Sequence, residues 1–260
     1  MSRRAAMIRL VAGFVVAVAV WRLSDLVVPP GYTHGTHAAR AALALAGTLL
    51  GWGVVSRLTG PPRAPDGIDL RWFALGAVSY LVPTAVAGAA VLVLGLARVS
   101  PNLAPGAMLG QGLVLLLLVL AFEAIPEELL FRDLLYTSLR RLAGAAVAVV
   151  GQAVLFVLWG ALTGSSLTLD RLVVFFLFSI ALGILRHLSG HVATTMGFHA
   201  AFQLSAQWLL GTNWDGWAVT DDQLWLAGAL FVPPLLLAPG IVRLASRPRV
   251  RIGQARPSAA

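Results

Sequence analysis

All three glutamates of this 260-residue chain lie within six positions, at Glu123, Glu127 and Glu128, directly after a long apolar run. An ionisable side chain beside a membrane-length apolar segment is costly to keep, so it is read first as a functional group with a partner. Arg132 follows Glu128 by four residues, the spacing at which two side chains meet on one helix face. A carboxylate held in this way can deprotonate a water, so the cluster predicts acid–base chemistry.

His199 and Gln203 form a second candidate group, because they are also four residues apart and share a face if the segment is helical. Both side chains can donate hydrogen bonds, so they can stabilise an oxyanion while a carboxylate across a cavity activates water. This is a hydrolase arrangement. Taken alone, however, a buried histidine is more often hydrogen-bonded for structural reasons, and the sequence does not bring His199 to the glutamates.

The elements that must position these groups are membrane-spanning helices. The chain is 58% apolar and 12% charged, with a mean hydropathy of +0.84, which lies outside the range of soluble domains. About 20 apolar residues cross a bilayer core of about 30 Å. We therefore predict an all-α polytopic transmembrane bundle of about eight spans, approximately 10–28, 41–55, 72–96, 107–125, 144–162, 172–188, 192–210 and 224–242.

The distribution of arginine predicts the orientation. Every basic side chain is arginine, and the net charge is +8. If the N-terminus is cytoplasmic, Arg40, Arg98 and Arg171 fall outside, and most other arginines fall inside, as the positive-inside rule requires. We expect a multi-pass protein of a bacterial plasma membrane with both termini in the cytoplasm. Orientation and attraction to anionic membrane lipids account for the charge, so no nucleic-acid partner is needed.

The chain is expected to form one membrane-embedded domain, residues 1–246, followed by a basic disordered tail, residues 247–260. No repeat of fixed period is present. The sequence has no cysteine, which excludes disulfides, a thiolate nucleophile and thiolate metal ligands.

Pro126 suits the first turn of a new helix, so we expect the motif helix to begin where the fourth span reaches the cytoplasmic interface. Glu127 and Glu128 would then lie at its N-terminus, where the helix dipole favours negative charge. The following leucines form one stripe and Arg140 and Arg141 lie near the end, which is typical of an interfacial amphipathic helix. On spacing alone, a structural cap at the membrane boundary is the alternative role of the Glu-Arg pair.

The segment Glu127-Glu128-Leu-Leu-Phe-Arg132 resembles the Glu-Glu-x-x-x-Arg first motif of the CAAX protease and bacteriocin-processing family of intramembrane proteases. That family continues with a span carrying Phe-x-x-x-His and a later span carrying His-x-x-x-Asn or a similar residue. The order agrees over residues 113–208. The resemblance implies that Glu127 and Glu128 activate water, that Arg132 orients them, that His199 acts on the oxyanion side, and that Gln203 replaces the asparagine.

The second motif departs from the family, because Phe156-Val-Leu-Trp-Gly160 has glycine where histidine is expected. Family members are usually called metalloproteases, and a catalytic zinc needs about three protein ligands and one open position. Glu127, Glu128 and His199 are the tentative ligands. The lost histidine weakens the case for zinc, and a glutamate-activated water without metal is the other mechanism. The cofactor is therefore left open between a divalent metal such as zinc and none.

Three further features leave alternatives open. His187 and His191 could replace the lost histidine if the turn between them is helical. Residues 164–166 resemble the rhomboid Gly-x-Ser signature only superficially. Glu123 would share a face with Glu127 in a straight helix, so either Glu123 is protonated and orients Glu127 by a hydrogen bond, or Pro126 separates the two.

These observations predict an intramembrane endopeptidase that hydrolyses a peptide bond near the cytoplasmic membrane face. Its partners would be membrane lipids and a peptide or protein substrate with a membrane-associated segment. The competing reading is a catalytically degenerate family member that serves as a membrane scaffold or binds a partner. A transporter that uses the buried carboxylates is a third reading, although the repeated halves typical of transporters are absent.

Overall fold

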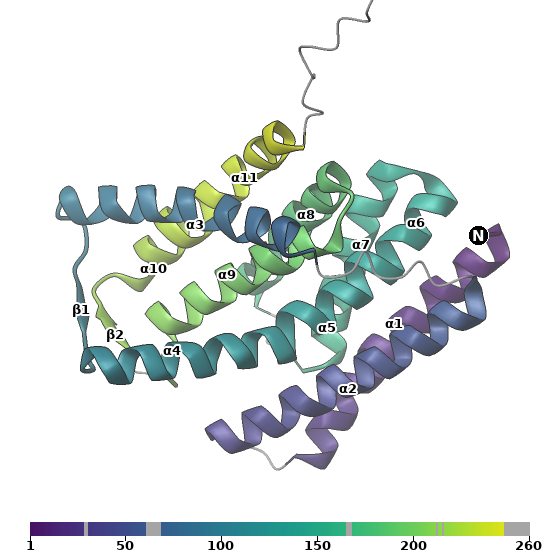
Figure 1. Ribbon diagram of the computed structural model, residues 1–260, viewed down its shortest axis with the longest axis horizontal. Coiled ribbons are helices and arrows are strands. Elements are labelled where there is room, and N and C mark those ends of the chain that lie inside the picture. Colours follow the sequence, from purple (N-terminus) through teal and green to yellow (C-terminus); the bar gives the residue numbers. More distant parts are fainter. Residues whose placement is uncertain (29–30, 61–68, 165–167, 212, 215, 247–260) are drawn as a thin grey trace, which may run out of the picture.

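The computed structural model describes residues 1–28, 31–60, 69–164, 168–211, 213–214 and 216–246. Over these residues the chain is a bundle of long helices (Figure 1). This confirms the predicted all-α polytopic architecture. The helical stretches are α1 (Arg3–Val27), α2 (His34–Thr59), α3 (Leu70–Val93), the continuous stretch Pro105–Ala143, α7 (Ala145–Leu162), α8 (Leu169–Ser189), α9 (Val192–Leu210) and the stretch Asp222–Ala245.

Each of the eight predicted spans corresponds to one of these stretches, and seven of them are long and apolar enough to cross a membrane. The exception is α9, which has sufficient length but carries His199, Gln203 and Gln207. Its residues 192–202 are all buried, and Figure 1 shows the helix running through the middle of the bundle. Neighbouring helices thus cover this part of α9, which includes His199, whereas Gln203 and Gln207 are half-buried.

The motif helix does not begin at Pro126, contrary to the sequence-based expectation. The stretch consists of α4 (Pro105–Val119), a π turn (Leu120–Ala124), α5 (Ile125–Glu127), a second π turn (Glu128–Leu135) and α6 (Tyr136–Ala143). Proline in a helix removes a hydrogen bond and clashes with the preceding turn. The wider π turn directly before α5 accommodates that clash, so the helix continues through the proline.

The motif segment is buried inside the bundle, so its polar side chains face protein and not solvent. Glu127 is 5% exposed and both Glu128 and Arg132 are 0% exposed. The reason is that α1 covers the predicted leucine stripe: a Cβ added at Gly13 would lie 2.9 Å from Leu135 Cδ1. Exposed residues appear only from Arg140 onward.

The closest helix crossing joins α3 to α9. A Cβ added at Gly76 would lie 1.9 Å from the carbonyl oxygen of Thr194, and one at Gly197 would lie 2.0 Å from that of Phe73. Only glycine allows two backbones to approach so closely. Because Gly197 precedes His199 by two residues, this crossing fixes the depth and rotation of the histidine.

A short antiparallel strand pair, which the sequence analysis did not predict, joins β1 (Val99–Pro101) to β2 (Trp217–Val219). It lies at the end of the bundle away from the N-terminus (Figure 1). The chain ends its described part with α10 (Asp222–Trp225), a third π turn (Leu226–Phe231) and α11 (Val232–Ala245). Tyr80 Oη donates a 3.0 Å hydrogen bond to the Leu230 carbonyl and so ties α3 to this π turn.

Candidate functional site

Glu128 is the centre of a buried polar cluster. Its Oε1 atom lies 3.2 Å from Arg132 Nη1 within the same helical stretch, as the i,i+4 spacing predicts. The same oxygen lies 2.8 Å from Nδ1 of His199, on α9. His199 is 1% exposed. The fold therefore brings the two chemical groups of the sequence into direct contact.

Glu127 lies on the other side of the histidine ring, with Oε2 3.8 Å from His199 Nε2. A carboxylate paired with a guanidinium accepts hydrogen bonds, so the proton of the Glu128–His199 bond is assigned to Nδ1. Nε2 of a neutral ring is then an acceptor. A water between Nε2 and the Glu127 carboxylate could donate to both, which is the geometry needed to activate it.

Two contacts outside the cluster hold Arg132. Ser179, on α8, accepts a 2.9 Å hydrogen bond from Arg132 Nη2. The ring of Phe156, on α7, lies 5.1 Å from the Arg132 Cζ atom, within the range of a cation–π contact. In addition, Arg186 Nε donates to the Arg132 backbone carbonyl at 3.2 Å. The guanidinium is thus fixed by α7 and α8 as well as by its own helix.

Gly160 lies one turn after Phe156 on the same face of α7. Because Phe156 faces Arg132, a histidine side chain at position 160 would also project toward the motif helix.

Gln203 keeps its side chain free among the described residues, whereas Glu123 pairs with a residue that was not considered for it. Gln203 is half-buried and makes no hydrogen bond within the described ranges, although it lies one turn from His199. Glu123 accepts from Nε2 of Gln207, with 3.0 Å to each carboxylate oxygen. The Glu123–Glu127 hydrogen bond is therefore not formed. The sequence analysis missed Gln207, whose signal was its position two turns after His199 on one face.

The other histidines considered as replacements do not join the cluster. His187 is exposed at the end of α8. His191 caps the start of α9 and stacks on Trp72, with ring centroids 4.4 Å apart and an interplanar angle of 14°. The Gly-x-Ser resemblance at residues 164–166 falls mostly on residues outside the described part of the chain.

The cluster does not fit a zinc ion as its side chains are arranged. Within the described residues, no group of three His, Asp or Glu side chains has the arrangement of a metal site. The tentative ligands explain why: Nδ1 of His199 and Oε1 of Glu128 are bonded to each other, and Arg132 pairs with that same oxygen. The atoms left for a metal are Nε2 of His199, the Glu127 carboxylate and Oε2 of Glu128, which has no hydrogen-bond partner within the described residues, and as placed they do not form the three-ligand arrangement of a catalytic zinc site.

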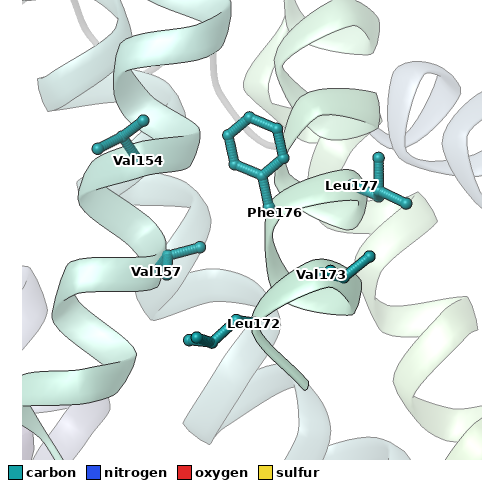
Figure 2. A pocket seen from close by; sticks show the side chains of 6 residues that line it. All are labelled: Val154, Val157, Leu172, Val173, Phe176 and Leu177. Carbon is teal, nitrogen blue, oxygen red and sulfur yellow. The ribbon is translucent and has the colours of Figure 1, made fainter. Parts of the chain in front are cut away.

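An apolar groove of about 310 Å³ lies along the seam between α7 and α8 (Figure 2). No titratable side chain lines it, so it offers a surface to lipid chains or apolar side chains and no second site for chemistry. The lining residues are Val154, Val157, Leu172, Val173, Phe176 and Leu177.

The buried Glu-Arg-His cluster lies in the part of the chain that the comparison with known families matches. The family described as type II CAAX prenyl endopeptidase Rce1-like matches residues 108–205, from α4 to α9. This segment is therefore similar to the CAAX protease and bacteriocin-processing family of intramembrane proteases. No curated protein and no solved structure matches the chain.

Proposed function

We propose that the chain is an intramembrane endopeptidase that hydrolyses a peptide bond with a water activated by Glu127. The observation that carries this proposal is the pairing around His199: the ring contacts Glu128 through Nδ1 and leaves Nε2 facing Glu127 at 3.8 Å. Oε1 of Glu128 pairs with both Arg132 and His199, and its Oε2 is buried. Glu127 is therefore the carboxylate that is free to take a proton.

In the proposed reaction, the water donates hydrogen bonds to Glu127 and to Nε2 of His199. Glu127 takes one proton as the water oxygen bonds to the carbonyl carbon, and the carbonyl oxygen becomes an oxyanion. The Gln203 amide, one turn along α9, supplies an N–H donor for that oxyanion. Glu127 then returns its proton to the leaving amine nitrogen as the carbon–nitrogen bond breaks, so that protons balance.

The proposed reaction takes place inside the membrane-embedded part of the protein. His199 is the eighth of the 19 residues of α9, which places it about 10 Å from the first residue of the helix and about 16 Å from the last. We assign the nearer end to the cytoplasm because Arg71, Arg140 and Arg141 lie there. We propose that both termini are cytoplasmic, that the membrane is a bacterial plasma membrane, and that residues 1–246 form one domain.

The substrate must reach a buried site from the bilayer, so we propose a peptide or protein with a membrane-associated segment. Membrane lipids surround the bundle and can occupy the apolar groove between α7 and α8.

The test is cleavage of a library of quenched fluorescent peptides, with and without a lipid anchor, by purified protein in nanodiscs. Glu127→Gln should lower kcat by about 10²- to 10⁴-fold, the range of general acid–base catalysis. Asp170→Asn is the matched control, because it makes the corresponding acid-to-amide change at an exposed carboxylate on α8. Equal cleavage by wild type and Glu127→Gln would overturn the proposal.

A degenerate scaffold is the second candidate, and Gly160 is the observation that favours it. In that case the Glu-Arg-His cluster is kept for folding. Wild type would then be silent, and Gly160→His would gain cleavage that Glu127→Gln in the same background removes. A substrate cleaved by wild type would exclude the scaffold reading.

A further inference from the structure

A chain of hydrogen bonds extends from the candidate site through α8 to α7. The Ser179 hydroxyl accepts from Arg132 Nη2 at 2.9 Å and donates to Gln152 Oε1 at 3.0 Å. The amide nitrogen of Gln152 donates to the carbonyls of Ser179 and Val149, at 2.7 and 2.9 Å. A hydroxyl has a single proton to donate. Because Ser179 uses that proton for Gln152, the lone pairs of the Ser179 oxygen are left to accept the hydrogen bond from Arg132.

Burial makes this chain decisive for the orientation of the guanidinium. Gln152, Ser179 and Arg132 are all fully buried. Arg132 Nε and Nη1 have no hydrogen-bond partner within the described residues, although Nη1 lies in the ion pair with Glu128. The bond to Ser179 is thus the one hydrogen bond that the described residues supply to the guanidinium. A buried charge without such a bond is free to rotate away from its acid or to draw water in.

The α7–α8 seam has space for the Gln152 amide because Gly183 lies opposite it. A Cβ added at Gly183 would lie 2.8 Å from Gln152 Nε2 and 3.3 Å from Val149 Cγ1. Ser179 and Gly183 are one turn apart on α8, so the same helix face supplies both the hydroxyl and the space. A larger residue at 183 would push the amide off its two carbonyl acceptors.

On α7, the same face carries Gln152, Phe156 and Gly160 at successive turns. Phe156 packs against the Arg132 guanidinium, and Gln152 is connected to the guanidinium through the Ser179 hydroxyl. The third position on this face, where the family motif has histidine, is Gly160. We propose that Gln152 and Ser179 are positioning residues that hold Arg132 on Glu128, and through Glu128 set the orientation and tautomer of His199. The expected effect on turnover rests on the proposed hydrolytic function, but the effect on His199 does not.

The test uses the full chain in nanodiscs and reads the His199 imidazole by ¹⁵N NMR, with its signals assigned by their loss in His199→Gln. Wild type should show the Nδ1–H tautomer, and Ser179→Ala and Gln152→Leu should each shift the tautomer balance. Ser138→Ala is the matched control, because Ser138 is also fully buried but donates only to Leu134 of its own helix. It should leave the His199 signals unchanged.

The kinetic arm measures peptide cleavage by the same proteins. Ser179→Ala and Gln152→Leu should each lower kcat about tenfold or more with KM unchanged, the loss expected for one hydrogen bond to a charged group. The double variant should lose no more than the worse single variant, because both act through one chain. Ser179→Thr keeps the hydroxyl and should restore most of the activity.

The two proposals fail in different ways. Unchanged His199 signals and unchanged kcat in Ser179→Ala and Gln152→Leu would overturn the positioning role and leave the protease proposal intact. Shifted signals in a protein whose wild type cleaves nothing would support the positioning role and count against hydrolysis. If Ser179→Ala does not fold, Gly183→Ala displaces the same amide without changing either hydrogen-bonding residue and must give the same shift.

Discussion

Replacing Glu128 by glutamine should destabilise the protein strongly, because it removes the charge that faces Arg132 in a fully buried site. The two groups are 3.2 Å apart and 0% exposed. At an effective dielectric constant of about 20, unit charges at this distance attract by about 5 kcal/mol. Removal of one partner of a buried pair costs about 3–5 kcal/mol for the same reason. We expect Glu128→Gln to lower the free energy of unfolding by that amount.

The assay is reversible unfolding in mixed micelles, with increasing SDS fraction and tryptophan fluorescence as the signal. A double variant, Glu128→Leu with Arg132→Met, should recover most of the loss, since an apolar pair of similar volume avoids the desolvation of both charges. Asp25→Asn is the control, because its ion pair with Arg40 spans 3.7 Å at a partly exposed position and should contribute less than about 1 kcal/mol. A loss below about 1 kcal/mol in Glu128→Gln would refute the account of the cluster as a tight buried pair.

Three other substitutions test the surroundings of the site. Gly197→Ala should lower the free energy of unfolding by about 3 kcal/mol in the same assay, since its Cβ would overlap a backbone carbonyl at 2.0 Å. Gly53→Ala is the control and should leave the free energy of unfolding unchanged, because nothing lies within 4 Å of its added Cβ. Equal effects of the two substitutions would refute the close crossing. Trp52→Phe should lower the free energy of unfolding by about 1.5–3 kcal/mol, because it removes the 2.7 Å hydrogen bond from the indole to Asp133. An unchanged free energy of unfolding would mean that this bond does not hold α2 to the motif helix. Glu123→Gln should change kcat of peptide cleavage less than about threefold, because the Glu123 carboxylate is hydrogen-bonded to Gln207 and not to the other two glutamates. A loss of kcat as large as that expected for the general base would show that Glu123 takes part in the reaction.

The sequence predicted the helices well because the signal for a membrane span is local. An uninterrupted apolar run needs no knowledge of its neighbours, and the predicted limits of α9 agree with the structure. The i,i+4 contact between Glu128 and Arg132 is local too. The continuation of the helix through Pro126 was not predictable in this way, because it depends on a π turn that no side-chain pattern announces.

The contacts that complete the candidate site are tertiary, and that is why the sequence left them open. Glu128 and His199 are 71 residues apart, and their 2.8 Å contact depends on how α9 packs. Ser179 had no distinguishing neighbour in the sequence and matters only because Arg132 faces it. The small residues at Gly76 and Gly197 permit close packing, but only the fold shows that each meets a carbonyl of the other helix.

The crossing of α3 and α9 has a consequence for how the protein is made. Because α9 is not among the seven helices that are apolar enough to cross a membrane, it enters the bilayer at low cost only if α3 is already there to receive it. A nascent chain that stops before α9 therefore carries Glu127 and Glu128 in the membrane with no histidine to meet them. The contact between Glu128 and His199 can therefore form only once the second-last long helix has been inserted.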